Sequence, residues 1–468
     1  MQNELINYVR IEERKDRKMT VEEYIKNAKI AQQAFEKFSQ EKIDQAVKII
    51  AKSVFDNAEC LAKIAVEETG MGNIPDKITK NKNKAKMIFE SLKNKKTMGI
   101  IEKNEDEGIT KIAKPIGVVL GITPMTNPTV TPMSNAMFAL KCGNAIIVSP
   151  HHGAINSSRK TVELINTNLA KKGFPDNLIQ IVKEHSRDQT RTLMSSVDIV
   201  IATGGMGMVK AAYSSGKPAL GVGAGNVQCI IDENYNLKIA AKKIVAGRSF
   251  DNGIICSAEQ SIIISEKDYD VLLAELGNAG ALVLTDENEI SKIRDVVFVD
   301  GKLNRQLIGQ PAEAILEMAR LTKKDRTKII AVPAMGTGKK DVLSGEKMCP
   351  VISIYKYKNF KEAIYIAREN LETAGKGHSV CIHSDNKDNI EYAATNLSVS
   401  RFVINQISAS SAGGSFNNGL APTNTLGCGS WGNNSISENL TYKHLMNVSR
   451  IAYYLPDKKV PSDDEIWN

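Results

Sequence analysis

The sequence predicts an α/β protein of two lobes, each built on a parallel sheet, with a small β arm for contact between subunits. Three observations lead to this prediction. The chain has 468 residues, whereas single hydrophobic cores stop growing near ~250–300 residues. Two successive series of β-branched runs alternate with helical stretches, as in parallel sheets covered on both faces. The first hundred residues carry helical periodicity instead.

The N-terminal stretch, residues 1–96, is predicted to consist of helices that belong to the first lobe. Thr20 and Glu23 have the spacing of a capping box. The apolar side chains that follow at helical spacing are Tyr24, Ala28, Ala31, Phe35 and Phe38. Gly70 ends the third helical stretch. Residues 1–18 are either a short amphipathic tail or a segment before a natural start at Met19.

Charge and cysteine content restrict the classes of partner and compartment. The formal net charge is +8 and the pI is near 8.9, which favours anionic partners such as cofactor phosphates. We interpret the densest basic run, from Lys80 to Lys96, as the solvated face of a helix, and no nucleic-acid-binding module is visible. No apolar run reaches the ~18–20 residues of a membrane span. Seven scattered cysteines without a CxxC pair predict a reducing, cytoplasmic compartment and no metal site.

The strands are predicted in chain order after a hairpin at residues 97–113, whose β-prone arms flank an acidic turn. The first series is "GVVLGIT", "NAIIVSP", "NLIQIVKE" and "VDIVIATGG". The second series is "VQCIIDE", "QSIIISE", "TKIIAVPA", "VISIYKY", "HSVCIHS" and "RFVINQI". The glycine- and asparagine-rich residues 411–434 then form a long loop, and long loops in compact enzymes are often functional.

Two glycine clusters are candidates for contact with a ligand. Gly204 to Gly207 lie between a strand and a helix, where backbone N–H groups can hold a phosphate. The spacing is not GxGxxG and no acidic residue follows at about 20 residues, so a purely structural turn is equally open. Gly221 to Asn226 precede the strand "VQCIIDE", where glycine permits close approach of backbone to a ligand. A tight β-bulge is the alternative there.

Three polar residues are candidates for chemistry. Asn127 follows the strand "GVVLGIT", and its amide is placed to donate to an oxyanion; a turn asparagine before proline is the alternative. Glu346 lies in "GEKMCPV", and the ordinary interpretation of such a glutamate is an exposed carboxylate in a loop. Cys256 lies in a polar loop between a helix and a strand, which is the setting of a thiolate nucleophile.

Together these stretches resemble the aldehyde dehydrogenase superfamily over nearly the whole chain. The stretches that carry the resemblance are "FDNGIICSAEQS", "EKMCPV", "AGGSFNNG", "TLGCGSWGNNSISENLTYKHL" and "NVSRI". Within the superfamily the sequence is most similar to the CoA-acylating branch, and there to CoA-dependent succinate-semialdehyde dehydrogenases. The resemblance implies two Rossmann-like lobes and an oligomerisation arm, assembled as a homodimer or homotetramer.

The resemblance also implies roles for individual residues. Cys256 matches the nucleophile, and Asn127 matches the oxyanion donor that acts with the backbone N–H of Cys256. Glu346 matches the carboxylate that holds the nicotinamide ribose. The residues that match the nucleotide-contacting turn are Ala202, Thr203, Gly204, Gly205, Met206 and Gly207. Those that match the segment under the adenosine ribose are Ser149, Pro150 and His151.

Two departures from the hydrolytic members of the family bear on the reaction. Gly221 stands where those enzymes have a glutamate that activates water, and a CoA thiol needs less help than water. The missing side chain is also expected to open space for CoA. Ser149 stands where those enzymes usually have a lysine. The sequence therefore does not decide whether the enzyme prefers NAD or NADP. A small side chain there, with His151 and His152 beside it, could admit a 2′-phosphate.

The expected division of the chain and the expected reaction follow from the resemblance. Residues 114–225 are the nucleotide-binding domain, residues 226–435 the catalytic domain with the cysteine loop, and residues 436–468 a C-terminal oligomerisation segment. The expected reaction converts succinate semialdehyde and CoA to succinyl-CoA with NAD(P); acetaldehyde, propionaldehyde or butyraldehyde is the alternative substrate. Candidate groups for the substrate carboxylate, left unranked, are Arg401, Arg248 and Ser408 to Ser411.

Overall fold

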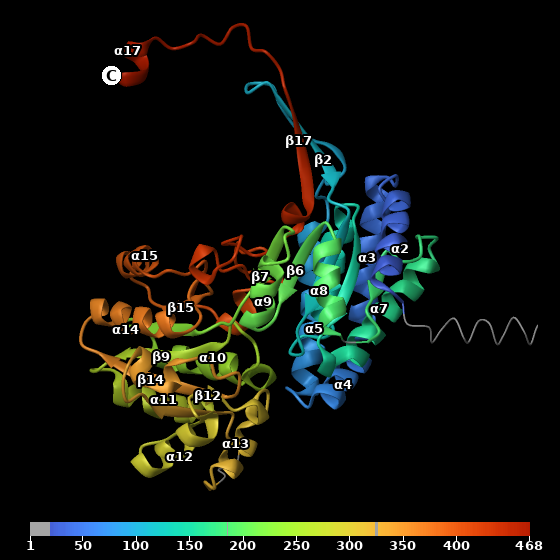
Figure 1. Cartoon of the computed structure of the whole chain (residues 1–468). Helices are drawn as coiled ribbons and strands as arrows, with labels where there is room; N and C mark the ends of the chain where they lie inside the picture. Colours follow the sequence, from blue (N-terminus) through green and yellow to red (C-terminus); the bar gives the residue numbers. More distant parts are fainter. Residues whose placement is uncertain (1–18, 185, 323–325) are drawn as a thin grey trace, which may run out of the picture.

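The computed structural model describes residues 19–184, 186–322 and 326–468. It has two α/β bodies, and a long β arm projects from the one that holds the N-terminal helices (Figure 1). The predicted α/β class with parallel sheets is confirmed. The alternative predictions for residues 1–18 lie outside the described residues.

Four helices follow the start of the described chain: α2 (Val21–Phe35), α3 (Gln40–Asp56), α4 (Ala58–Thr69) and α5 (Ile74–Leu92). The capping box predicted at Thr20 and Glu23 is present. The apolar face predicted for α2 is buried, with Phe38 partly buried beyond it. Gly70 ends α4 with φ 65°, a left-handed conformation that glycine adopts without steric cost.

The first sheet has five parallel strands in the order β5-β4-β3-β6-β7. They are β3 (Val118–Thr123), β4 (Ala145–Pro150), β5 (Ile179–Ile181), β6 (Ile199–Thr203) and β7 (Ala219–Val222). The helices between them are α6 (Val130–Lys141), α7 (Ile155–Ala170), α8 (Arg187–Ser196) and α9 (Met206–Tyr213). The four predicted strands are present, and β7 is an additional short one. The strand order reverses between β3 and β6, where open parallel sheets bind ligands at the carboxyl ends of their strands.

The second sheet has seven parallel strands in the order β10-β13-β14-β9-β8-β15-β16. They are β8 (Val227–Ile231), β9 (Glu259–Ser265), β10 (Ala281–Val283), β13 (Ile329–Pro333), β14 (Val351–Tyr357), β15 (Val380–His383) and β16 (Phe402–Ile404). The helices are α10 (Leu237–Ser249), α11 (Tyr269–Ala279), α12 (Glu287–Val297), α13 (Ala312–Met318), α14 (Phe360–Thr373), α15 (Lys387–Asn396) and α16 (Ser408–Ser411). The six predicted strands are present, and β10 is a short edge strand that the sequence did not predict. A small hairpin, β11 (Phe298–Val299) with β12 (Lys302–Leu303), follows α12.

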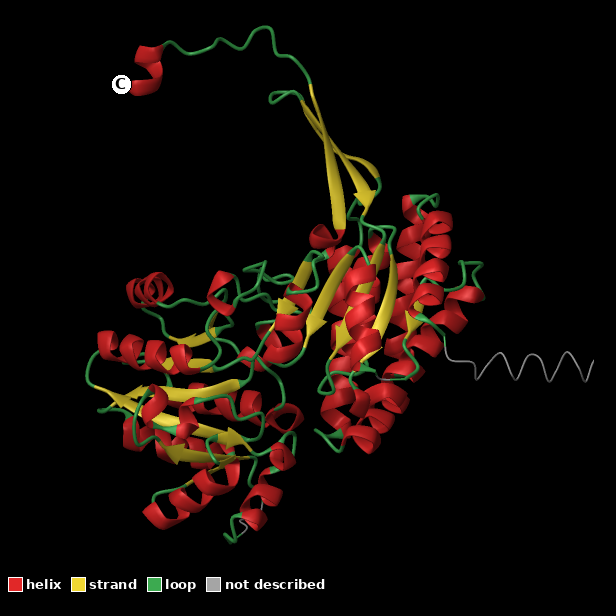
Figure 2. Ribbon diagram, in the orientation of Figure 1, coloured by secondary structure: helices red, strands yellow, loops and turns green. Residues whose placement is uncertain are grey.

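The arm consists of three antiparallel strands that extend beyond the body (Figure 2). The predicted hairpin is formed by β1 (Gly99–Asn104) and β2 (Ile109–Pro115). A third strand, β17 (Met446–Ala452), comes from the C-terminal end of the chain and pairs with β2. The short helix α17 (Asp463–Trp467) follows it. Residues more than three hundred positions apart in the sequence therefore build one arm.

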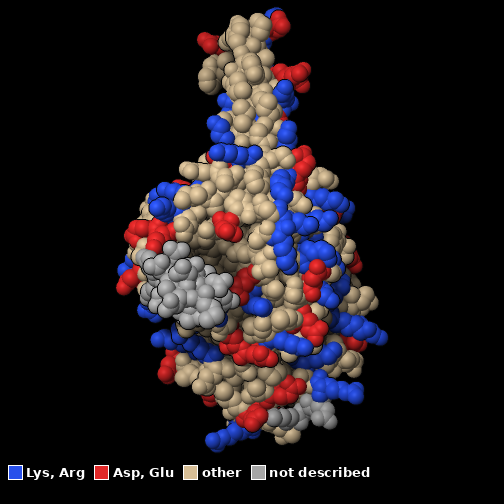
Figure 3. All heavy atoms as spheres, turned by 90° about the vertical axis from the view of Figure 1, so that its right-hand side faces the viewer, with Lys and Arg blue, Asp and Glu red and all other residues tan. Residues whose placement is uncertain are grey.

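Charged side chains of both signs cover the outer face of the first body. Figure 3 shows Lys and Arg interspersed with Asp and Glu on this face, below the projecting arm. The net positive charge is therefore distributed among acidic groups there and does not form a surface of one sign. Among the described residues, no helix combines the length and the apolar character that crossing a membrane requires.

Candidate active site

The predicted site residues lie at opposite ends of the strands in the two sheets. Asn127 and the Gly204 turn follow the carboxyl ends of β3 and β6. Cys256 and Glu346 precede the amino ends of β9 and β14. The residues that precede β8, β15 and β16 at this same edge include Asn226, His378 and Arg401. Loops at the carboxyl edge of one sheet and the amino edge of the other thus supply the candidate site.

The loop of residues 411–434 joins the two bodies near these edges. Thr425 Oγ1 lies 3.4 Å from Thr203 Oγ1 at the end of β6. Asn424 Nδ2 donates to the carbonyl of Val130, the first residue of α6, at 3.0 Å. The loop for which the sequence predicted a function is therefore ordered, and it contacts the end of β6 and the start of α6 in the first body.

Cys256 is half-buried, and the backbone of Gly225 packs against it. A Cβ at Gly225 would stand 2.0 Å from the Cys256 carbonyl oxygen, so only glycine permits this approach. Burial and the negative charge of Glu346 raise the pKa of Cys256 to about 12, against the effect of Arg401. The resting residue is therefore a thiol that must lose a proton before it can attack.

Glu346 is linked to Cys256 through the same glycine. Its Oε1 accepts a hydrogen bond from Gly225 N at 3.1 Å. The side chain is only partly exposed, and burial raises its pKa to about 7. The default interpretation of Glu346 as a freely exposed loop carboxylate is therefore wrong, because the loop before β14 is packed against the glycine cluster.

Asn127 lies in the turn between β3 and α6 and is partly buried. Its carbonyl accepts from Thr131 N at 3.2 Å, which anchors the turn to the start of α6. Its side-chain amide makes one long hydrogen bond, from Nδ2 to Thr126 Oγ1 at 3.4 Å. A weakly engaged amide is suited to donating to a substrate oxygen, and its role as oxyanion donor stays a prediction.

The residues predicted to bind the nucleotide form an open turn at the start of α9. Gly205 is the N-cap residue of α9, and since glycine has no side chain, no side chain of the N-cap residue occupies the helix start. A Cβ at Gly205 or Gly207 would meet nothing within 4 Å. Ala202 is buried in β6, whereas Met206 is 48% exposed. The free backbone N–H groups at this helix start fit a phosphate group.

The segment predicted under the adenosine ribose follows β4, at the same edge of the first sheet. Ser149 is buried, with its Oγ 3.4 Å from Thr190 Oγ1, and Pro150 ends the strand. His151 Nδ1 accepts from Gly153 N at 3.1 Å. The rings of His151 and His152 lie 4.1 Å apart between their centroids. These residues thus lie in a position consistent with the predicted nucleotide site.

Gly221 does not line the open space that the sequence suggested. It lies within β7, where a Cβ would be 2.7 Å from Val209 Cγ1 and 2.8 Å from Tyr213 Cε2. Tyr213 Oη accepts hydrogen bonds from Gly221 N at 2.8 Å and from Ser435 N at 3.0 Å. The expectation of extra space for CoA at this position is wrong, because the side chains of α9 fill it.

Arg401 is not available to a substrate carboxylate. Only 2% of this residue is exposed. Its guanidinium donates to Ser379 Oγ, Asn439 Oδ1 and the carbonyls of His378 and Gly427. Arg401 therefore orders the loops around β15 and β16, and its candidacy as a substrate ligand is wrong.

The Arg248 side chain and the Ser408 backbone are likewise engaged within the protein. Arg248 is fully buried and donates to the carbonyls of Val351 and Cys349. The backbone N–H of Ser408 donates to Glu259 Oε1 at 2.7 Å. These contacts hold the chain around β9. The prediction of Arg248 as a substrate ligand is therefore wrong. Ser408 is buried at the start of its helix.

Lys84 is a candidate that the sequence analysis missed. Its Nζ donates to the carbonyls of Gly413 and Thr423 at 2.9 and 3.0 Å. Burial lowers its pKa to about 8, while a negative charge on Cys256 acts in the opposite direction. Lys84 thus contacts the loop of residues 411–434, which joins the two bodies near the candidate site. The interpretation of the basic run as a wholly solvated face is therefore wrong at Lys80 and Lys84.

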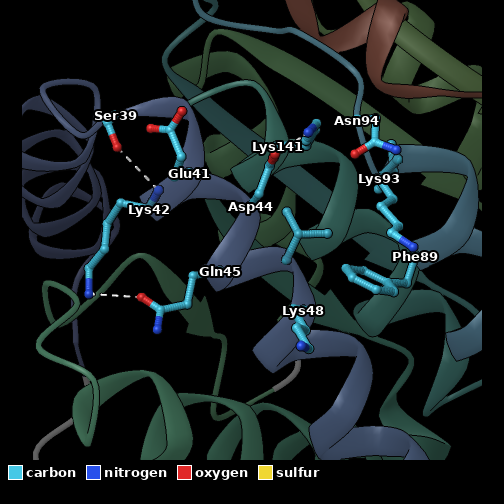
Figure 4. Close-up of a pocket in the computed structure, with 12 residues that line it drawn as sticks. Ser39, Glu41, Lys42, Asp44, Gln45, Lys48, Phe89, Lys93, Asn94 and Lys141 are labelled. Atoms are coloured by element: carbon cyan, nitrogen blue, oxygen red, sulfur yellow. Dashed lines mark hydrogen bonds and ion pairs between the residues drawn. The ribbon is translucent and has the colours of Figure 1, made fainter.

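A surface cavity of about 680 Å³ lies elsewhere, beside α3. Figure 4 shows its lining, including Lys42, whose Nζ donates to Gln45 Oε1 at 3.0 Å. Asp44 and Lys141 also line it and form an ion pair. None of the residues predicted for catalysis or nucleotide binding lines this cavity, so we assign it no part in the reaction.

The remaining thiols lie outside the candidate site, apart from Cys428, whose charge acts on Cys256. Among the described residues, one group has the spacing of metal ligands: the ligand atoms of Cys229, Cys381 and His383 lie within 4.8 Å of one another. All three side chains are fully buried in the second body. The prediction of no metal site stays a prediction.

Comparisons with known proteins agree with the geometry. A family model described as the aldehyde dehydrogenase family matches residues 8–420. The chain is 52% identical to a succinate-semialdehyde dehydrogenase (acetylating) of Clostridium kluyveri, over 96% of this chain and 99% of that protein. An acetylating aldehyde dehydrogenase from Geobacillus thermoglucosidasius superposes with a TM-score of 0.91 at 37% identity, covering 95% of this chain and 98% of that chain. A propionaldehyde dehydrogenase of Rhodopseudomonas palustris with bound CoA and an acylated cysteine gives 0.82 at 29% identity, covering 93% and 97% of the two chains.

Proposed function

Since this chain belongs to the aldehyde dehydrogenase family, we propose that it is a CoA-acylating enzyme that interconverts succinate semialdehyde and succinyl-CoA. The proposed reaction is reversible and uses NADP or NAD. The observation that carries the proposal is the packing of Cys256 against Gly225, whose N–H donates to Glu346 Oε1. The high identity to a succinate-semialdehyde dehydrogenase over almost its whole length supports the same substrate.

Cys256 is proposed to carry the acyl group through the reaction. Its thiol releases a proton to solvent, and the thiolate attacks the aldehyde carbon to give a thiohemiacetal. The oxyanion accepts hydrogen bonds from Asn127 Nδ2 and the Cys256 backbone N–H. A bound nicotinamide nucleotide supplies the acceptor for the hydride that leaves this carbon. Cys256 is then left as a thioester.

The second half of the proposed reaction transfers the acyl group to the thiol of CoA. A thiolate attacks a thioester without the activation that water needs, because it is the stronger nucleophile at neutral pH. Gly221 supplies no carboxylate to activate water, and Tyr213 and Val209 occupy the space beside it. Slow hydrolysis and fast thiol transfer are both expected from this arrangement.

Lys84 is proposed to bind the distal carboxylate of the substrate. Its present partners are two backbone carbonyls, so its charge is not neutralised by a hydrogen-bonded carboxylate. A lysine held in this way gains a charge-assisted hydrogen bond when a carboxylate arrives. Arg401 lacks this capacity because its donors are directed at protein carbonyls and side chains, and Arg248 lacks it because its side chain is fully buried.

The open turn at Gly205 and the segment after β4 are proposed to hold the nucleotide. The phosphates would lie at the start of α9, and Ser149 is compatible with either NAD or NADP. Glu346 would hold the nicotinamide ribose. The arm of β1, β2 and β17 is proposed to contact a second copy of the chain in a homodimer or homotetramer.

The experiment that tests the proposed function is a set of initial rates with succinyl-CoA, acetyl-CoA and butyryl-CoA, each with NADH and NADPH. We expect succinyl-CoA to give the highest kcat/KM. A preference of about tenfold or more for butyryl-CoA, equivalent to ~1.4 kcal/mol, would instead support the alternative of an uncharged aldehyde. An enzyme inactive with every acyl-CoA would contradict the proposed class of reaction.

A further inference from the structure

The loop that leads to Cys256 is anchored to helix α5 of the other body through Asp251. The Asp251 side chain is fully buried. Its Oδ2 accepts from Lys77 Nζ at 3.1 Å and from Lys80 Nζ at 2.5 Å. Its Oδ1 accepts from the backbone N–H of Asn73, just before α5, at 3.1 Å. A carboxylate with three donors from one segment fixes this loop on that helix.

The backbone at Asp251 is held in a conformation that few residues adopt. Asp251 and its neighbour Asn252 have φ of 51° and 53°. Two consecutive left-handed residues other than glycine persist only where their contacts enforce them. Asn252 Nδ2 donates to the Gly309 carbonyl at 2.9 Å, and Asp251 N donates to Asp76 Oδ2 at 2.7 Å.

The carboxylate at this anchor remains ionised in the folded protein. Burial alone would raise the pKa of Asp251, but the charges and hydrogen bonds of Lys80 and Lys77 outweigh it and lower that pKa. A buried carboxylate is tolerated only when it is paired. Neutralising either side of this cluster should therefore loosen the loop.

The same face of α5 carries Lys84. Lys77, Lys80 and Lys84 are separated by three and four residues, so they lie in one row along the helix. The first two pair with Asp251 in the loop that leads to Cys256, and the third donates to the carbonyls of Gly413 and Thr423 in the loop of residues 411–434. Helix α5 therefore carries Lys84 and also binds the loop that leads to Cys256, so it determines how far apart the two residues lie.

We propose that Asp251 is a positioning residue: with Lys77 and Lys80 it fixes the separation of Lys84 and Cys256. This separation then selects aldehydes by the distance between their carbonyl carbon and their carboxylate. The proposal rests on the proposed function, in which Lys84 binds that carboxylate. Asp251 acts through the other residues and does not contact the substrate.

The test compares succinate semialdehyde with the semialdehydes one methylene shorter and longer, and with uncharged butyraldehyde. In the wild-type protein we expect kcat/KM to favour succinate semialdehyde over each homologue by about tenfold, which one methylene can provide. Lys77→Met and Asp251→Asn should bring this chain-length preference close to one. Activity with butyraldehyde should change by less than about threefold, because it needs no cation.

Two further variants separate positioning from general stability. Lys80→Arg keeps a cation on Asp251 and should keep the chain-length preference. Lys141→Met removes a buried lysine that pairs with Asp44 on α3, so it should lower the melting temperature and leave the preference unchanged. All rates are measured below the melting temperature of every variant.

The outcomes distinguish the two levels of the proposal. An equal loss with all four aldehydes, or a lower melting temperature with an unchanged preference, would show that Asp251 has a structural role only. A wild-type protein without preference for carboxylate substrates, in which Lys84→Met also leaves the relative rates unchanged, would overturn the proposed function. The positioning role would be overturned with it. A wild-type preference that Lys84→Met abolishes and Asp251→Asn spares overturns the positioning role alone.

Discussion

Gly225 lies so close to Cys256 that a Cβ on the glycine would stand 3.3 Å from the Cβ of the cysteine. The N–H of this glycine also donates to Glu346 Oε1. Cys256 and Glu346 therefore share one piece of backbone, and the charge of Glu346 acts on the Cys256 thiol. This relationship governs how the reactivity of the thiol should vary with pH.

Cys256→Ala should abolish turnover and leave nucleotide binding intact, because the thiol carries the acyl group but no phosphate contact. Turnover is measured in both directions, and nucleotide binding by fluorescence titration. Cys142 is buried directly after α6, and Cys229 and Cys381 are buried in β8 and β15; their alanine variants are the matched controls that should keep most activity. Activity of Cys256→Ala above about a hundredth of wild type would reject the assignment.

Alkylation of Cys256 by iodoacetamide should accelerate with rising pH across the neutral range. The pKa of the thiol is raised to about 12, so the thiolate fraction grows about tenfold per pH unit. Glu346→Gln should react faster than wild type above pH 7, where Glu346 carries charge, and equally fast below it. This sign follows because the pKa of Glu346 is raised to about 7 and its charge raises that of Cys256. Identical alkylation rates for wild type and Glu346→Gln at every pH would show that Glu346 and Cys256 are not coupled.

Asn127→Ala should lower kcat by about 10²–10³-fold, the usual cost of one oxyanion donor. Nucleotide affinity should change little, because the residue lies on the β3 loop and not on the turn before α9. Steady-state rates with both substrates varied provide the measurement. If only KM rises, Asn127 binds or orients the aldehyde and does not stabilise the oxyanion.

The preference for succinate semialdehyde over butyraldehyde should fall as the pH rises above about 8. The pKa of Lys84 is lowered to about 8, and only its protonated form attracts the substrate carboxylate, so the binding advantage disappears on deprotonation. Lys84→Met should show a low ratio at every pH. The ratio of the two kcat/KM values is measured from pH 6 to pH 10. A ratio independent of pH in the wild-type protein would remove Lys84 from the substrate site.

Aldehyde oxidation without CoA should stop after one turnover per active site, because no side chain at Gly221 activates water. The measurement is the size of the NAD(P)H burst with and without CoA. Steady oxidation without a thiol would implicate Glu259 or Glu346 as the base. Gly221→Glu should lose thermal stability, since overpacking against Val209 and Tyr213 costs about 1–3 kcal/mol, and should gain little hydrolysis. Gly205→Ala, at an open position, is the control for added side-chain volume.

Much of the fold was open to prediction, because its determinants are local. The alternation of apolar runs and helical stretches predicts parallel strands, since only a strand covered on both faces is continuously apolar. Capping at Thr20 and the stop at Gly70 are likewise set by neighbouring residues. The short strands β7 and β10 were missed because each contains one β-branched residue, whereas the equally short predicted strands β5 and β16 contain two.

The sequence by itself determined the class of fold and singled out Cys256, because a thiol in a polar loop between a helix and a strand is a local pattern. Only the tertiary structure decided which basic side chain contacts the loop of residues 411–434 beside the candidate site. Lys84 and its partner Gly413 are separated by 329 positions, and Arg401 looks equally suitable until its hydrogen-bond partners are known. Periodicity fixes which face of a helix a side chain occupies, whereas the partner on that face depends on how two bodies pack, which no local spacing encodes.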